Sequence, residues 1–146
     1  MGQSSAQISL DEFILEMGRE PVGSLTHERL MDLTRRLAIS SELIESRTCF
    51  AASTYTRNLL CRSADFELLV LCWKPGHEST IHNHAGSLNA IRVDRGGIHQ
   101  LANTSDEHLV TVHVYAPPLT ELVVYSTSAA ETERRPLRYT LADDLA

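Results

Sequence analysis

The chain has 146 residues, of which 42% are hydrophobic and 22% charged, and this balance predicts one globular domain over residues 1–146 with a buried core. Its formal net charge of −6 argues against a nucleic-acid partner, because such partners are bound by basic surfaces. No run of about eighteen apolar residues is available to cross a membrane, and residues 1–10 lack the basic and apolar regions of a signal peptide. These exclusions leave a protein that binds a small molecule.

The N-terminal part, residues 1–46, is predicted to be a helical leader. The pattern Ser9-Leu-Asp-Glu12 is a capping box and begins a first helix, which Gly18 and Pro21 are expected to end. A second helix is predicted from Thr26, and a short third helix over Ser41–Glu45. The apolar stripe of the second helix is Leu30, Leu33 and Leu37.

From residue 47 to residue 146 the pattern changes to short strands separated by turn residues. This order predicts a mainly β fold, a small β-barrel or jelly roll behind an N-terminal helical segment. The predicted strands are Tyr55–Cys61, Phe66–Trp73, Thr80–His84, Ser87–Val93, Ile98–Ala102, Leu109–Tyr115, Glu121–Ser126 and Leu137–Thr140.

Two histidines, His82 and His84, stand two apart on a predicted strand and therefore share one face of the sheet. A pair of imidazoles on one face is half of a metal site. The spacing Gly76-x5-His82-x-His84 matches the first motif of the cupin barrels, and Gly96-x2-His99-x3-Asn103 matches the second. Residues 85–89 carry no acidic ligand, so the predicted site is three neutral imidazoles, which suit iron, copper, nickel and zinc alike.

Further motifs surround these histidines in a fixed order. They are Tyr55-Thr-Arg57-Asn58, then Leu71-Cys-Trp73-x-Pro-Gly76-His77-x-Ser79-x-Ile81-His82-x-His84, then His99-x3-Asn103, and last His113-x-Tyr115-x-Pro117-Pro118. The set resembles the cysteine dioxygenase family of thiol dioxygenases within the cupin superfamily. The resemblance covers the chain from about Cys49 to the end, and the helical leader agrees with that family's N-terminal helices.

The resemblance implies a role for each matching residue. Ferrous iron, Fe(2+), would be held by His82, His84 and His99. Arg57 would pair with the carboxylate of the substrate, Tyr115 would hydrogen-bond substrate and oxygen, and His113 would orient that tyrosine. Thr111 stands where many members have a serine that completes the relay. Tyr55, which shares the strand face of Arg57, and His77 are predicted as further substrate contacts.

The implied reaction adds both atoms of O2 to the sulfur of cysteine and gives cysteine sulfinic acid. An arginine at position 57 favours cysteine, but 3-mercaptopropionate or another small thiol stays an alternative. A metal cupin with other chemistry, or a non-catalytic barrel that binds a small ligand, is also open. Asn89 stands where some members carry a cysteine that crosslinks to the tyrosine, so no crosslink to Tyr115 is expected. The oligomeric state is left open, with a monomer included.

Three cysteines, Cys49, Cys61 and Cys72, form no Cys-x-x-Cys pair, and an odd count fits reduced thiols in the cytoplasm. Several of the candidate site residues could also have purely structural roles. Arg57 could be an exposed strand residue paired with Asp65 or Glu67, and Trp73 a packing residue. His27 and His108 are expected to face solvent, and Arg134-Arg135 to lie in a solvated turn.

The spacing between His84 and His99 is the main anomaly, because the family has several strands there and this chain has only residues 85–98. In a simple hairpin of Ser87–Val93 with Ile98–Ala102, His99 would lie more than about 20 Å from His84. Metal ligands must lie within about 2.3 Å of one ion. Either residues are missing between Val93 and Asp94 or the barrel has lost strands there, and the intact motifs on both sides favour the first.

Overall fold

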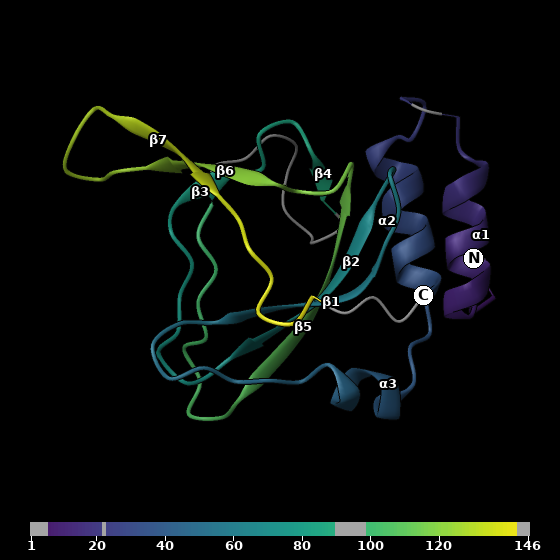
Figure 1. Cartoon of the computed structure of the whole chain (residues 1–146), viewed down its shortest axis with the longest axis horizontal. Helices are drawn as coiled ribbons and strands as arrows, with labels where there is room; N and C mark the ends of the chain where they lie inside the picture. Colours follow the sequence, from purple (N-terminus) through teal and green to yellow (C-terminus); the bar gives the residue numbers. More distant parts are fainter. Residues whose placement is uncertain (1–5, 22, 90–98, 143–146) are drawn as a thin grey trace, which may run out of the picture.

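The computed structural model describes residues 6–21, 23–89 and 99–142. It confirms a mainly β fold behind a helical leader, compatible with a cupin-type fold (Figure 1). The helices are α1 (Leu10–Arg19), α2 (His27–Arg36) and α3 (Ser41–Ser46). The strands are β1 (Thr56–Arg62), β2 (Glu67–Trp73), β3 (His82–Asn83), β4 (Leu88–Asn89), β5 (Leu109–Ala116), β6 (Glu121–Tyr125) and β7 (Thr132–Pro136).

The predicted capping box begins α1. The Ser9 hydroxyl accepts the backbone N–H of Glu12 at 3.2 Å, and the Glu12 carboxylate accepts the backbone N–H of Ser9 at 2.7 Å. The helix continues through Gly18 and ends at Arg19, between the two residues that were expected to end it. Thr26 caps α2 in the same way, as its hydroxyl accepts the N–H of Arg29.

The strands form two antiparallel sheets, one in the order β1-β2-β5-β4 and the other in the order β3-β6-β7. All seven residues of β2 are buried, because this strand is covered on both faces. Its side chains alternate between two apolar clusters. Leu68, Val70 and Cys72 belong to the cluster beneath the helices, and Leu69, Leu71 and Trp73 belong to the cluster that faces the second sheet.

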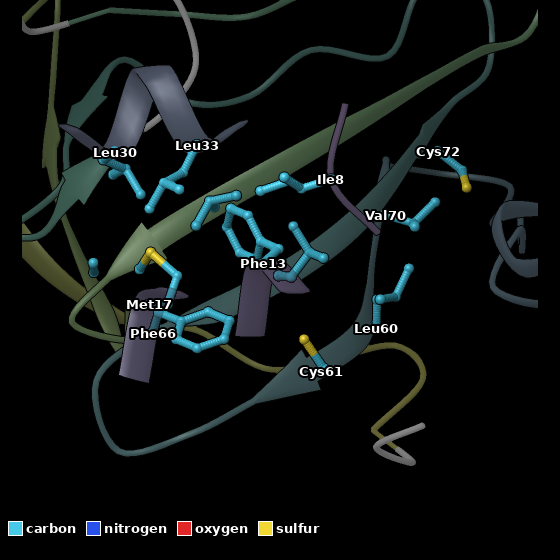
Figure 2. Close-up of a cluster of buried hydrophobic side chains, with 13 residues drawn as sticks. Ile8, Phe13, Met17, Leu30, Leu33, Leu60, Cys61, Phe66, Val70 and Cys72 are labelled. Atoms are coloured by element: carbon cyan, nitrogen blue, oxygen red, sulfur yellow. The ribbon is translucent and has the colours of Figure 1, made fainter. Parts of the chain in front are cut away.

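The helices α1 and α2 lie side by side against one face of the larger sheet (Figure 1). Figure 2 shows Phe13 and Met17 of α1 packing toward Phe66, at the start of β2. The rings of Phe13 and Phe66 meet edge to face with centroids 5.8 Å apart. This contact fixes the helical leader to the sheet that carries the other, site-facing cluster.

The C-terminal part departs from the prediction. Leu137–Thr140 forms no strand, and the last strand is Thr132–Pro136, which pairs with β6. Arg134 and Arg135 therefore lie in a strand and not in a turn. Every residue of β7 is exposed, so the alternation of apolar and polar residues that reveals a half-buried strand is absent from it. Backbone pairing with β6 and the ion pair of Arg134 with Glu121 hold this edge strand.

A segment after β7 covers the outer edge of β1. The backbone N–H of Leu59 donates to Leu141 at 2.8 Å, and the N–H of Thr140 donates to the carbonyl of Arg57 at 2.7 Å. The contact is a parallel bridge between Asn58 and Leu141.

The simple hairpin that would have kept His99 far from His84 is not the arrangement of the described residues. Leu88 and Asn89 pair with β5, and His99 pairs with His82 instead of with residues 90–92. Two backbone hydrogen bonds of 2.9 and 3.0 Å join His82 and His99. The remainder of the predicted strand Ser87–Val93, the turn at 94–97 and the junction of Val93 with Asp94 lie outside the described residues.

Among the residues that the structure describes, none of the three helices has the length and apolar character needed to cross a bilayer.

Replacing Phe13 with alanine is expected to lower the free energy of unfolding by about 3–5 kcal/mol, because it removes a fully buried ring and leaves a cavity. Leu15 lies on the same helix and is 54% exposed, so Leu15→Ala is the matched control, with a change within about 0.5 kcal/mol. Urea unfolding measures both. Equal losses would contradict the packing of α1 on Phe66.

Candidate metal centre and adjoining pocket

Three histidines converge where the two sheets meet. His82 and His84 follow one another on the same face at β3, and His99 stands opposite His82 in the antiparallel bridge. The ring centroids lie 4.6 Å apart for His82 and His99, 4.8 Å for His84 and His99, and 5.2 Å for His82 and His84. One nitrogen from each ring lies within 4.8 Å of the other two, so this group could hold a metal ion.

The backbone around the triad sets which nitrogen faces the centre. His82 Nδ1 lies 2.7 Å from the carbonyl of Thr80, so Nδ1 carries the proton and donates it, leaving Nε2 as the coordinating atom. After His84 the chain turns sharply. The Asn83 side chain accepts the N–H of Ala85 at 3.1 Å, and Gly86 takes a φ of 91° that favours glycine.

The protonation state also suits a metal. Burial lowers the pKa of His82, and burial followed by the neighbouring imidazoles lowers the pKa of His84 to about 3. Both rings are therefore neutral near pH 7, which is the form that binds metals. No carboxylate or thiolate joins the three imidazoles within the part of the chain that the structure describes, as the sequence predicts.

A hydrogen-bonded chain runs along β5 beside the triad. The indole N–H of Trp73 donates to Thr111 Oγ1 at 2.9 Å, Thr111 Oγ1 lies 2.8 Å from His113 Nε2, and His113 Nδ1 lies 3.2 Å from the Tyr115 hydroxyl. Indole can only donate, so Thr111 Oγ1 accepts from Trp73, and the tautomer of His113 sets the direction of the next two hydrogen bonds. In the tautomer with the proton on Nδ1, Thr111 donates to His113 and His113 donates to Tyr115, which leaves the Tyr115 proton to point elsewhere.

Tyr115 brings this chain to the histidines, since its ring centroid lies 5.3 Å from that of His84. Burial raises the pKa of Tyr115, so its hydroxyl stays protonated and can donate a hydrogen bond at neutral pH. Burial likewise lowers the pKa of His113 to about 3, and this ring stays neutral. The predicted pairing of Thr111, His113 and Tyr115 on one face is thus present.

A cavity joins these residues to Arg57. Its lining includes His82, His113, Tyr115, Tyr55, Arg57 and Leu137. Its volume is about 20 Å³, which is room for about one water molecule. A thiol the size of cysteine requires the lining side chains to shift. Tyr55 stacks on Trp73 with ring centroids 4.3 Å apart. Trp73 therefore has the predicted packing role and, in addition, donates its hydrogen bond to Thr111.

Arg57 is buried and is not the exposed strand residue that the structural alternative predicted. Its ion-pair partner is Glu67. The guanidinium Nη2 lies 3.3 Å from Glu67 Oε1, and Nη1 donates to the Arg138 carbonyl at 3.4 Å. Sequence reasoning named Glu67 only as a surface partner. The signal that could have placed it inside is its position at the start of β2, in step with Leu69, Leu71 and Trp73 on the site-facing side.

His77 does not line this cavity. Its Nδ1 accepts the N–H of Lys74 at 3.1 Å, and its Nε2 lies 3.5 Å from the carbonyl of Ala52. Both ring nitrogens are engaged with backbone groups, so the structure gives His77 the alternative role of a turn residue. Asn103 is buried and holds the neighbouring turn through the carbonyls of Trp73 and Glu107.

Asn89 is a residue of this centre to which the sequence assigned no role of its own. It pairs with Tyr115 in the β4–β5 register, and its Nδ2 lies 3.3 and 3.4 Å from the two ring nitrogens of His84. Its carbonyl lies 3.0 Å from His27 Nε2. His27 is therefore half-buried against β4 and does not simply face solvent, whereas His108 is exposed as predicted.

The lowered pKa of His113 predicts how stability changes with pH. The unfolded chain binds a proton at this residue below about pH 6.5, while the folded chain does not until about pH 3. The free energy of unfolding therefore falls as the pH drops through this window, by about 1 kcal/mol per pH unit from His113. Urea titrations of metal-free protein should show a shallower decline in His113→Gln. An unchanged slope would contradict a buried neutral ring.

Comparison with known proteins agrees with the geometry. Residues 26–96, just under half of the chain, match the sequence model of the family described as cysteine dioxygenase type I. A stretch of 45 residues is 40% identical to cysteine dioxygenase type 1 of Homo sapiens and, equally, to that of Pongo abelii. It covers 30% of this chain and 22% of each relative, so the match spans about a fifth of their length. The matched residues 26–96 include Arg57, His82 and His84, so this part of the chain is similar to the cysteine dioxygenase family.

Proposed function

We propose that this protein is an iron-dependent thiol dioxygenase that oxidises cysteine to cysteine sulfinic acid. One observation carries the proposal: a triad of histidines stands beside a cavity that His82, a hydrogen-bonded tyrosine and a buried arginine line together. The family match supports a dioxygenase, although it ends at residue 96, before His99, His113 and Tyr115. The roles of these three residues therefore rest on the geometry and on the sequence motifs that contain them.

The donor set fits a ferrous ion. His82, His84 and His99 would hold it, and the fixed Nδ1 proton of His82 leaves a nitrogen free to coordinate. Three neutral ligands leave the charge of the ion uncompensated, which favours an anionic ligand such as a thiolate. When bound, the iron would supply the redox chemistry that delivers both atoms of dioxygen to the thiol sulfur.

The other residues bind and orient the substrate. Arg57 would attract the substrate carboxylate to the far end of the cavity, where burial strengthens a charge-assisted hydrogen bond. Tyr115 would donate its proton to the thiol or to oxygen when His113 is in the tautomer whose Nδ1 proton goes to the tyrosine oxygen. Tyr55 would form the wall beside Arg57.

The cysteines bear on the compartment of the reaction. None of the three forms a disulfide, which fits a reducing compartment such as the cytoplasm. Cysteine and O2 are the proposed small-molecule partners. A cupin that holds another metal and performs other chemistry would share the triad, so measurement of oxygen consumption separates the two.

Iron-loaded protein is expected to consume oxygen when cysteine is added and to form the sulfinate in equal amount. Tyr115→Phe should lower kcat about 100-fold, because it removes a proton donor while leaving the ring. Arg57→Gln should chiefly raise KM for cysteine. Arg134→Gln, whose side chain is 70% exposed, is the matched control and should leave both constants unchanged. Absence of thiol-dependent oxygen uptake in iron-loaded wild-type protein would falsify the proposal.

The metal centre can be tested without turnover. Wild-type protein is expected to bind one divalent ion per chain, and His99→Ala to bind it at least about 100-fold more weakly, since one of three ligands is lost. His108→Ala is the control, because His108 is exposed and lies against Phe50, outside the triad. Titration calorimetry with Fe(2+) under argon gives both affinities. Equal weakening in the two variants would argue against the triad.

A further inference from the structure

Glu67 is a buried carboxylate for which the proposed mechanism has no use. Its side chain has no exposed surface, yet its position on β2 points it to the site-facing side of the larger sheet. Carboxylates are rarely buried completely unless charge and hydrogen bonds compensate them. The groups around Glu67 therefore indicate what it does.

Two neutral donors hold Glu67 independently of Arg57. The backbone N–H of Leu119 donates to Oε1 at 3.0 Å, and the Tyr139 hydroxyl donates to Oε2. Burial, followed by the hydrogen bond to Glu67, raises the pKa of Tyr139 to about 12, so this donor keeps its proton at neutral pH. The carboxylate is thus fixed in place before any contact with the arginine is considered.

The contact with Arg57 is loose by comparison. Its two hydrogen bonds measure 3.3 Å to Glu67 and 3.4 Å to the Arg138 carbonyl, whereas charge-assisted pairs are usually about 2.7–2.9 Å. The guanidinium also lies over the ring of Tyr139, at 5.6 Å from its centroid. Arg57 therefore has a counter-ion but keeps donors that can turn to the cavity.

We infer that Glu67 determines the substrate specificity of this pocket by acting through Arg57. It neutralises the arginine from inside the protein, so that thiols with a carboxylate bind less tightly and thiols without one are accepted as well. The inference rests on the proposed function, because it takes the cavity beside the histidines as the thiol site. Glu67 is a positioning residue, because it contacts Arg57, Leu119 and Tyr139 and would act on the substrate through the arginine.

The physical reason is charge balance. A substrate carboxylate at the free edge of Arg57 enters a site that already contains one negative charge for one positive charge. It gains the attraction of the guanidinium and is repelled by Glu67 a few ångströms beyond, where burial leaves both interactions poorly screened. A thiol without a carboxylate is neither attracted by the Arg57 guanidinium nor repelled by Glu67.

The test compares cysteine with 2-aminoethanethiol, which is cysteine without its carboxylate. Both are titrated by calorimetry, without oxygen, into the metal-loaded full chain. In wild-type protein 2-aminoethanethiol should bind at least as tightly as cysteine. Glu67→Gln keeps the shape and an acceptor for Leu119, and it should tighten cysteine binding roughly tenfold and leave 2-aminoethanethiol within about twofold. Glu121→Gln, a change of equal charge on the surface, should alter neither.

A second variant guards against loss of folding, because Glu67→Gln leaves Arg57 without a counter-ion. The double variant Arg57→Gln/Glu67→Gln removes both charges, so cysteine should bind within about threefold of wild type. If Glu67 merely aimed Arg57 at the substrate, the double variant would lose cysteine affinity more than about tenfold, and Glu67→Gln would weaken cysteine binding. Either result overturns the inference, and so does a failure of both thiols to bind wild-type protein.

Oxygen uptake separates this inference from the proposed function. If wild-type protein consumes oxygen with cysteine but Glu67→Gln leaves the preference between the two thiols unchanged, the inference fails and the dioxygenase stands. If no oxygen is consumed but the preference shifts as described, Glu67 sets the specificity of a thiol-binding site with other chemistry.

Discussion

The alternation of side chains along β2 is the constraint on which the rest of the structure depends. Seven consecutive buried residues in a strand must be covered on both faces, and here the helices cover one face while the second sheet approaches the other. The same alternation in β1 and β5 places Arg57, His113 and Tyr115 on the site-facing side. The helical leader thus shapes the site without contributing a side chain to the cavity, because it buries the face that the site does not use.

The fold class, the capping box, the histidine pair and the relay on β5 could be predicted because each is local and depends on a period of two or on one turn of helix. The backbone pairing of His99 with His82 could not be predicted. Hairpins join strands that are neighbours in sequence, and no local pattern indicates a bridge that spans residues 83–98. The strand Thr132–Pro136 was missed because none of its residues is buried. Long-range pairing and exposed edges leave little trace in a single sequence.

The candidate site combines groups whose charges are controlled by burial. Burial keeps His84 neutral and Tyr115 protonated, and the charged side chains at the cavity are Arg57 and the neighbouring Glu67. A divalent ion would add two positive charges at the opposite end of a small cavity. In such a site the charge of the metal ion is at one end, the ion pair of Arg57 and Glu67 is at the other, and neutral hydrogen-bond donors lie between them.

The segment that follows β7 has a consequence for self-association. β1 is the outermost strand of its sheet, and an open edge of this kind offers unpaired backbone groups to other molecules. The bridge between Asn58 and Leu141 and the hydrogen bond from Thr140 to Arg57 occupy that edge with the chain's own backbone. Detachment of this segment would therefore do two things at once. It would expose a strand competent to pair with a second copy, and it would release the backbone that carries the arginine of the cavity.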